Sequence, residues 1–104
     1  MLKRYEKYMK VYSPTTDEGK GEGMGYYPVS LTFRTSEEVE AGDVLYTNLR
    51  YTAYGRRHRA PAGGYRRGMI LEDADGGEYH VLVPTLVEDL WILKVERVMQ
   101  NGEG

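Results

Sequence analysis

The sequence contains no cysteine among its 104 residues, so disulfide bonds and thiolate zinc sites are excluded. A small secreted scaffold would need such cross-links, and we therefore expect a protein that matures in a reducing cytoplasm. No apolar run approaches the ~20 residues that a membrane-spanning helix requires. Charged residues are interleaved throughout the first twelve positions, so we expect neither a signal peptide nor a membrane partner.

Histidine is also scarce, and the only two imidazoles lack suitable neighbours. His58 lies among arginines, which would keep a metal cation away, and His80 lies in a predicted strand between Tyr79 and Val81. Neither has the surroundings that a catalytic triad or a metal site requires. The composition therefore predicts a protein that is not an enzyme and that binds no metal or cofactor.

Two short motifs look like ligand-binding loops but lack the rest of the pattern. Residues 19–23, GKGEG, lead into a strand, whereas a phosphate-binding loop leads into a helix whose N-terminus faces the anion. Residues 73–76, DADG, resemble the start of a calcium loop, but Leu82 takes the position of the bidentate carboxylate. We expect a hairpin turn at residues 73–77 instead.

Tyrosine is abundant: the chain has ten, against one tryptophan and one phenylalanine. Tyrosine is enriched on β-sheets and in protein interfaces, where one end of the side chain is dry and the other is wet. We expect some of these side chains to lie in an interface, although the simpler explanation is that tyrosine is a good strand former.

Apolar and polar residues alternate in short segments separated by glycine and proline, which is the pattern of antiparallel strands. Strands are predicted near residues 5–12, 26–34, 44–54, 68–72, 78–83 and 89–99. With no convincing amphipathic helix, the pattern favours an all-β fold. We expect a single domain over residues 1–104, a small antiparallel β-barrel or sandwich of about six strands with long flexible loops. The predicted core consists of Leu31, Phe33, Leu49, Tyr51, Val81, Trp91, Leu93 and Val95.

Three segments are predicted to lie outside the strands. Residues 13–25 contain four glycines and almost no apolar side chains, so we expect a flexible loop. Residues 56–67 form a basic loop, and residues 100–104 form a polar, frayed tail. An acidic corner, broken by Gly42, precedes the strand that begins at residue 44; its carboxylates are Glu37, Glu38 and Glu40.

The net charge of −2 hides an asymmetry between the basic loop and the rest of the chain. The loop contains Arg56, Arg57, Arg59, Arg66 and Arg67, with no acidic residue among them. Removing these five from the 14 basic residues leaves nine, against 16 acidic residues. Such a dipolar molecule can bind a phosphate backbone through the loop, or the acidic face of another copy of itself, unless the loop is simply solvated.

Two long segments combine strands and turns in a recognisable order. Residues 36–57 read SEEVEAGDVLYTNLRYTAYGRR, an acidic "EV-E-G" start that leads into a long strand ending in arginines. Residues 76–98 read GGEYHVLVPTLVEDLWILKVERV, a "G-x-Y-x-V" strand followed by a strand that closes on "E-x-V". Over residues 29–99, the chain resembles the head–tail joining proteins of tailed bacteriophages, also called head-closure, stopper or neck proteins. It differs from them in its expanded arginine loop and in its basic, tyrosine-rich first strand.

The resemblance implies a non-enzymatic β-barrel that forms a ring between the portal, or its adaptor, and the tail. It implies a virion protein made in the cytoplasm of a bacterial host, from a phage or prophage gene. Its partners would be other copies of itself, the portal or adaptor protein and a tail protein, and its long loops could contact DNA in the channel. The expected assembly or channel contacts are Glu37, Glu38, Glu40, Arg56, Arg57, Arg59, Arg66 and Arg67.

Two other functions fit parts of the sequence. In a small nucleic-acid-binding β-barrel, the arginines of residues 56–67 would hold the backbone and Tyr65 would stack on a base, with Tyr46 or Tyr51 on the sheet. A phage-encoded inhibitor of a host protein would explain the acidic body but no particular motif. Salt-dependent binding of short DNA would distinguish the nucleic-acid-binding barrel from the joining protein.

Overall fold

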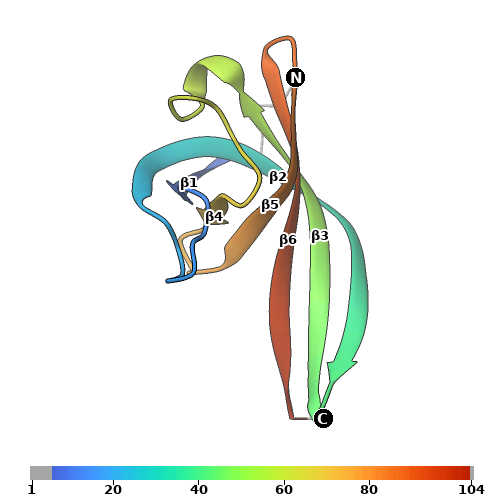
Figure 1. Cartoon of the computed structure of the whole chain (residues 1–104). Helices are drawn as coiled ribbons and strands as arrows, with labels where there is room; N and C mark the ends of the chain where they lie inside the picture. The colour runs from blue at the N-terminus through green and yellow to red at the C-terminus, as the bar shows by residue number, and fades with distance from the viewer. Residues whose placement is uncertain (1–5, 104) are drawn as a thin grey trace.

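The computed structural model describes residues 6–103, with side chains described as far as residue 100. It is an all-β fold in which six antiparallel strands close into a barrel in the order β1-β2-β3-β6-β5-β4 (Figure 1). The elements are β1 (Glu6–Tyr12), β2 (Gly23–Ala41), β3 (Val44–Arg56), the 3₁₀ turn η1 (Arg57–Arg59), β4 (Ile70–Glu72), β5 (Glu78–Val87) and β6 (Leu90–Glu103). The predicted fold class is thereby confirmed. In the described range, no helix is long and apolar enough to span a membrane.

The short strand β4 closes the barrel because it pairs with β1 on one side and β5 on the other. Val11 lies opposite Leu71 in the first pairing, and Leu71 lies opposite Tyr79 in the second. The turn after β4 is held by the Asp73 carboxylate, whose Oδ1 accepts hydrogen bonds from the backbone N–H groups of Asp75 (3.0 Å) and Gly77 (2.8 Å). This Asx-type turn is the hairpin that the sequence predicts for residues 73–77.

The core is built from the inward-facing positions of the strands, which alternate with outward-facing ones, and from Tyr65 and Met69 in the loop before β4. Its buried side chains are Met9, Val11, Val29, Ala53, Tyr65, Met69, Leu71, Tyr79, Val81, Leu93 and Val95. The predictions for Val81, Leu93 and Val95 are therefore correct, and Leu31, Tyr51 and Trp91 pack against this core while staying partly exposed.

Two of the predicted core residues lie outside it. Phe33 is 53% exposed, and Leu49 is half-buried but does not belong to the core cluster. Both lie where β2 and β3 leave the barrel, next to a bulge in β2 between Phe33 and Thr35. Both residues lie on the face of the sheet that the alternation predicts. Beyond the barrel, however, no other strand of the described chain packs against that face.

Beyond the bulge, β2, β3 and β6 continue together as a three-stranded arm, which we define as residues 34–41, 44–50 and 96–103. Figure 1 shows it projecting away from the barrel. The acidic corner of the sequence is part of this arm: Glu37 to Glu40 are paired with β3, and the chain turns only at Gly42 and Asp43. The predicted frayed tail differs too, because β6 pairs with β3 as far as Glu103, opposite Val44. Tyr5 and Gly104 lie outside the described residues.

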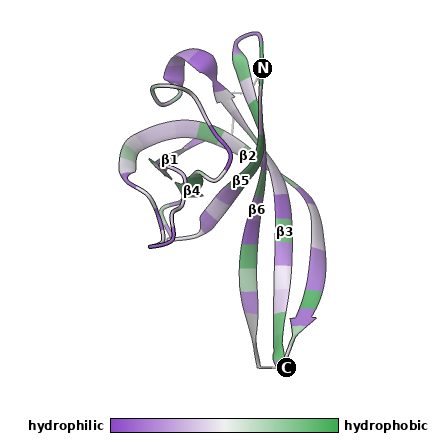
Figure 2. Cartoon of the chain, in the orientation of Figure 1, coloured by the Kyte–Doolittle hydropathy of each residue, from purple (hydrophilic) through white to green (hydrophobic). Residues whose placement is uncertain are grey.

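The arm exposes apolar side chains because it has no second layer. Val39 (37%), Val98 (52%) and Met99 (40%) are all accessible to solvent. The pairing of Asn48 with Val98 and of Thr47 with Met99 puts these two β6 residues on opposite faces. Figure 2 shows apolar and polar residues intermixed along the arm strands. A thin sheet with apolar side chains on both faces is typical of a segment that packs against a partner.

Because Leu93 lies inside the core and Phe33 outside it, replacing each by alanine should lower the free energy of unfolding by different amounts. Leu93→Ala empties a fully buried position and should lower the free energy of unfolding by about 2–5 kcal/mol. Phe33→Ala should cost less than about 1.5 kcal/mol, since it mainly loses an edge-to-face contact with Tyr51. Urea denaturation followed by circular dichroism measures both, and equal losses would show that Phe33 belongs to the core.

Candidate interaction surfaces

The predicted acidic residues lie near the tip of the arm. Glu37, Glu38 and Glu40 are exposed, and consecutive residues point to opposite faces of β2. Within the described residues, β1 pairs with β2 only as far as Ser30, so this part of β2 is a free edge. No basic residue of the described range forms an ion pair with these three carboxylates. The arm tip therefore presents uncompensated negative charge along an open edge.

The structure divides the arginine loop into two groups. Arg57 and Arg59 are the first and last residues of η1, and Arg56 precedes it. All three are exposed, at the end of the molecule opposite the arm tip (Figure 1). Arg66 and Arg67 lie farther along, on the stretch that descends to β4 between the buried residues Tyr65 and Met69. The five arginines therefore belong to two groups, separated in the chain by residues 60–65.

The first group is held in place by the backbone and by one side-chain contact. The Arg57 N–H donates to the carbonyl of Asp89 (2.8 Å), which ties η1 to the β5–β6 turn. Arg59 donates to the Tyr8 hydroxyl, and its guanidinium lies 5.7 Å from the centre of that ring. Arg56 and Arg57 have no side-chain partner in the described residues, so their guanidinium groups are available to a ligand.

A pocket of about 330 Å³ opens between this loop and the β5–β6 hairpin. We call it the Trp91 pocket; it is lined by Arg57, Ala60, Pro61, Gly63, Gly64, Leu86 and Trp91. The indole packs edge-on against Tyr65, with ring centres 5.8 Å apart. Gly64 has a φ of +79°, and a Cβ there would lie 2.4 Å from the indole Cζ2, so glycine is required beside the ring. A Gly-Gly pair in a loop is the only sequence signal for this site.

Tyr65 does not offer the stacking surface that a nucleic-acid-binding barrel would use. It is 2% exposed and belongs to the core. Burial raises the pKa of its hydroxyl, because the phenolate would be poorly solvated there. Tyr51 is also engaged, with edge-to-face contacts to Phe33 and Tyr79 at 5.5 and 5.2 Å.

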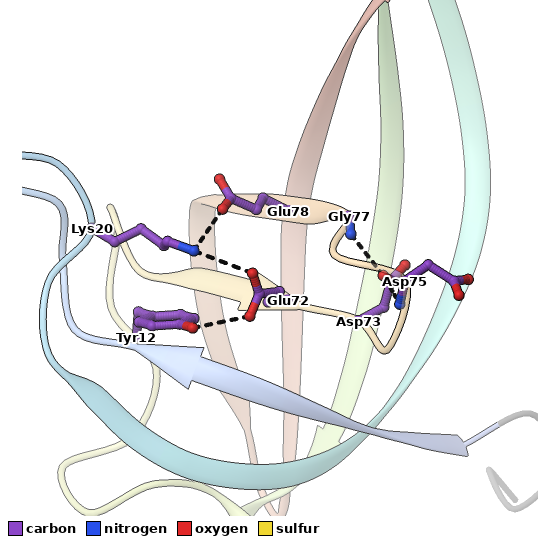
Figure 3. A network of polar contacts seen from close by, with 7 residues as sticks. All are labelled: Tyr12, Lys20, Glu72, Asp73, Asp75, Gly77 and Glu78. Atoms are coloured by element: carbon purple, nitrogen blue, oxygen red, sulfur yellow. Dashed lines mark hydrogen bonds and ion pairs between the residues drawn. The ribbon is translucent and has the colours of Figure 1, made fainter.

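The glycine-rich loop after β1 is held by polar contacts that the sequence does not reveal. Lys20 Nζ donates to Glu78 Oε2 (2.8 Å) and Glu72 Oε2 (3.2 Å), and the Tyr12 hydroxyl donates to Glu72 Oε1 (2.9 Å), as Figure 3 shows. We call these four residues the lysine clamp. The segment predicted as a flexible loop thus folds back on β4 and β5, and its last residues, from Gly23, already belong to β2.

The lysine clamp shifts the pKa values of Lys20 and Glu72. The hydrogen bonds that Lys20 donates to Glu78 and Glu72 raise its pKa, because they stabilise the ammonium form. The hydrogen bonds from Tyr12 and Lys20 lower the pKa of Glu72, because they stabilise its carboxylate. Lys20 is therefore engaged with carboxylates, and residues 19–23 do not form a phosphate site.

A second basic surface, absent from the sequence-based predictions, lies at the base of the arm. Arg34, Arg50 and Lys94 line a depression of about 490 Å³ near bulges in β2 and β5. Arg50 pairs with Glu96 at 2.9 Å, and Arg34 Nε donates to the Thr52 hydroxyl at 2.9 Å. A bulge shifts Arg34 out of the strand alternation, which is why sequence periodicity does not indicate this cluster.

The two histidines lie on different elements of the barrel. His58 is exposed on η1, and His80 lies on β5 opposite Ile70 and Glu96. No three histidine, aspartate or glutamate side chains of the described part lie together so that they could hold a metal ion. No protein-family model, curated protein or solved structure matches this chain.

The lysine clamp predicts that one substitution will release residues 13–22. Lys20→Met removes both ion pairs, so the amide of Ser13, which donates to the Glu22 carbonyl, should exchange several-fold faster at pH 7. The amide of Val81 in the barrel should keep its protection. Lys94→Met is the matched control, because Lys94 is exposed and forms no ion pair in the described residues. Unchanged exchange at Ser13 would contradict the clamp.

The clamp should also open in acid. Because folding lowers the pKa of Glu72, its contribution is fully present above the usual value near 4.5 and is lost as the pH falls through the lower folded value. Folding raises the pKa of Lys20, so its contribution persists up to 10.5 and is lost only above that pH. The NMR shift of the Glu72 side-chain carboxyl carbon should therefore stay constant at neutral pH and titrate with a midpoint below the usual 4.5. A midpoint at the ordinary glutamate pKa would argue against the hydrogen bonds to Glu72.

Proposed function

We propose that this chain is a non-enzymatic virion protein that joins the head of a tailed bacteriophage to its tail as a ring subunit. The observation that carries the proposal is the arm, an extension of a closed barrel that exposes Val39, Val98 and Met99 and leaves one edge of β2 open. An isolated sheet of this kind gains stability by packing against other subunits. The resemblance over residues 29–99 adds support for a joining role.

In this role the barrel is the rigid body of each subunit and the arm reaches beyond it. The ring would contact the portal or its adaptor on one side and a tail protein on the other. The arm would extend from a molecule that measures 44 × 31 × 23 Å into a central channel or onto a neighbouring ring. The acidic arm tip and the arginines of residues 56–67 are the proposed assembly or channel contacts, and they would mainly guide docking and fix its orientation.

A nucleic-acid-binding function has weaker support. Tyr8 and Tyr26 are exposed aromatic side chains, at 58% and 64% exposure. They share a depression with Glu72 and Asp73, whose carboxylates would repel phosphates. Arg59 already lies over the Tyr8 ring, which leaves less of that ring for stacking on a base.

Reversing two arginines tests the joining role. In the phage that encodes this chain, Arg56→Glu with Arg57→Glu should yield separate heads and tails in electron micrographs, while the purified variant keeps the circular dichroism spectrum of the parent. The purified parent chain should not bind short DNA at moderate salt. Tight, salt-sensitive DNA binding that the double variant loses would overturn the joining role.

The matched variant is Arg66→Glu with Arg67→Glu, which makes the same change in net charge on the other part of the loop. If both variants block joining equally, the effect belongs to the whole of residues 56–67, through contacts by both groups or through overall charge. If the first has the larger effect, the surface around η1 makes the contact.

A further inference from the structure

We propose that the arm tip of one copy docks on the Trp91 pocket of a second copy, so that the chain self-associates head to tail. The arm tip is residues 37–43, and its counterpart is the Trp91 pocket with Arg56, Arg57 and Arg59. The inference deepens the proposed function, because it rests on a ring subunit contacting its own kind and identifies the two surfaces that meet.

The two surfaces cannot meet within one molecule. The arm lies at one end of the molecule, and the β5–β6 hairpin and η1 lie at the other (Figure 1). The longest dimension of the molecule is 44 Å. Each copy therefore carries one acidic tip and one basic pocket, far apart. A contact between such unlike surfaces is heterologous, and it propagates from copy to copy until the geometry closes a ring or continues as a filament.

The pocket combines an apolar floor with a positive rim. Trp91, Leu86 and Pro61 provide the floor, and Leu86 is 38% exposed beside the more accessible Val87 (49%). Arg57 lines the pocket. Arg56 is the residue before Arg57. In the described residues, no side chain forms a hydrogen bond or ion pair with the guanidinium group of either arginine. The hairpin turn adds Glu88 and Asp89, which offset only part of the arginine charge. A fitting ligand is an acidic segment with one apolar side chain.

The arm tip has this chemistry. Val39 is 37% exposed and is flanked in the chain by Glu38 and Glu40, with Glu37 one residue earlier and Asp43 in the turn. Among the described residues, this stretch of β2 is an unpaired edge of the sheet. If a second copy approaches that edge, side chains from both faces of β2 can contact its surface. Val39 would enter the apolar pocket while the carboxylates face the arginines.

The basic depression at the base of the arm fits the tip less well. Glu96 already neutralises Arg50, and Arg34 already donates hydrogen bonds to Thr52 and Tyr54. Its two arginines would have to give up existing partners to bind carboxylates, whereas Arg56 and Arg57 would not. The surface around η1 is therefore the better acceptor.

A mixing experiment with two charge-reversed variants tests the docking. The arm variant carries Glu37→Lys, Glu38→Lys and Glu40→Lys, and the loop variant carries Arg56→Glu, Arg57→Glu and Arg59→Glu. In sedimentation velocity at low salt and up to millimolar concentration, the parent chain should associate and each variant alone should remain monomeric. An equimolar mixture should associate beyond dimers, because the intact tip of the loop variant fits the intact pocket of the arm variant and the reversed tip of the arm variant fits the reversed loop of the loop variant. A chain that carries all six reversals should associate again.

The single tryptophan of the chain gives an independent readout, because it lies in the proposed pocket. Docking should shift Trp91 emission to shorter wavelength and protect it from acrylamide in the mixture, but not in either variant alone. Val39→Ser removes the apolar side chain without changing the charge and should weaken association at least several-fold. The control with Asp17→Lys, Glu18→Lys and Glu22→Lys makes the same charge change on an exposed loop and should associate like the parent.

Three results would overturn the docking. They are a monomeric parent at all concentrations, a mixture that stays monomeric, and a loss of association in the control equal to that in the arm variant. Short DNA that competes for the loop and shifts Trp91 emission in the arm variant would assign the pocket to nucleic acid instead. The joining role is decided separately by the electron micrographs of the Arg56 and Arg57 variant, so the docking can fail while the joining role stands.

Discussion

The fold depends on the pairing between β1 and β4. This ladder is only three residues long, with Lys10, Val11 and Tyr12 opposite Glu72, Leu71 and Ile70. If it opened, β1 and β4 would both expose unpaired edges and the core would face water. The ladder is reinforced from two sides: Val11 and Leu71 are buried in the core on one, and the lysine clamp crosses it on the other.

Closure at this point also explains why the molecule has an arm. The barrel is complete at the height where β1, β4 and β5 end, and a core exists only up to that height. β2, β3 and β6 are longer than the barrel, so their outer halves pair with each other but have nothing to pack on. The same three strands therefore serve as barrel wall at one end and as free sheet at the other.

The sequence predicts the strands and much of the core, since period-2 alternation reports which face of a strand is apolar. It correctly placed Val81, Leu93 and Val95 in the core. It could not show where the barrel ends, and so it also placed Phe33 there. Residues 37–40 looked like a corner because glutamate is uncommon in strands, yet a strand that is exposed on both faces tolerates such charges.

The candidate sites were less predictable because they depend on contacts between distant parts of the chain. Composition revealed the charge of the arginine loop but not its division into two groups, nor that Tyr65 is buried. The partners of Lys20 are Glu72 and Glu78, more than fifty residues away, and nothing local indicates them. The Trp91 pocket exists because Gly64 adopts a positive φ next to the indole, a property of the folded loop.

The two-residue turn at Gly42 and Asp43 makes the length of the arm independent of the barrel. Each residue added to a strand lengthens it by about 3.4 Å, so two more in both β2 and β3 extend the hairpin by about 7 Å. Two residues preserve which side chains share a face, whereas one residue exchanges the faces beyond it. The length of the arm can therefore change in steps of this size while the barrel stays the same.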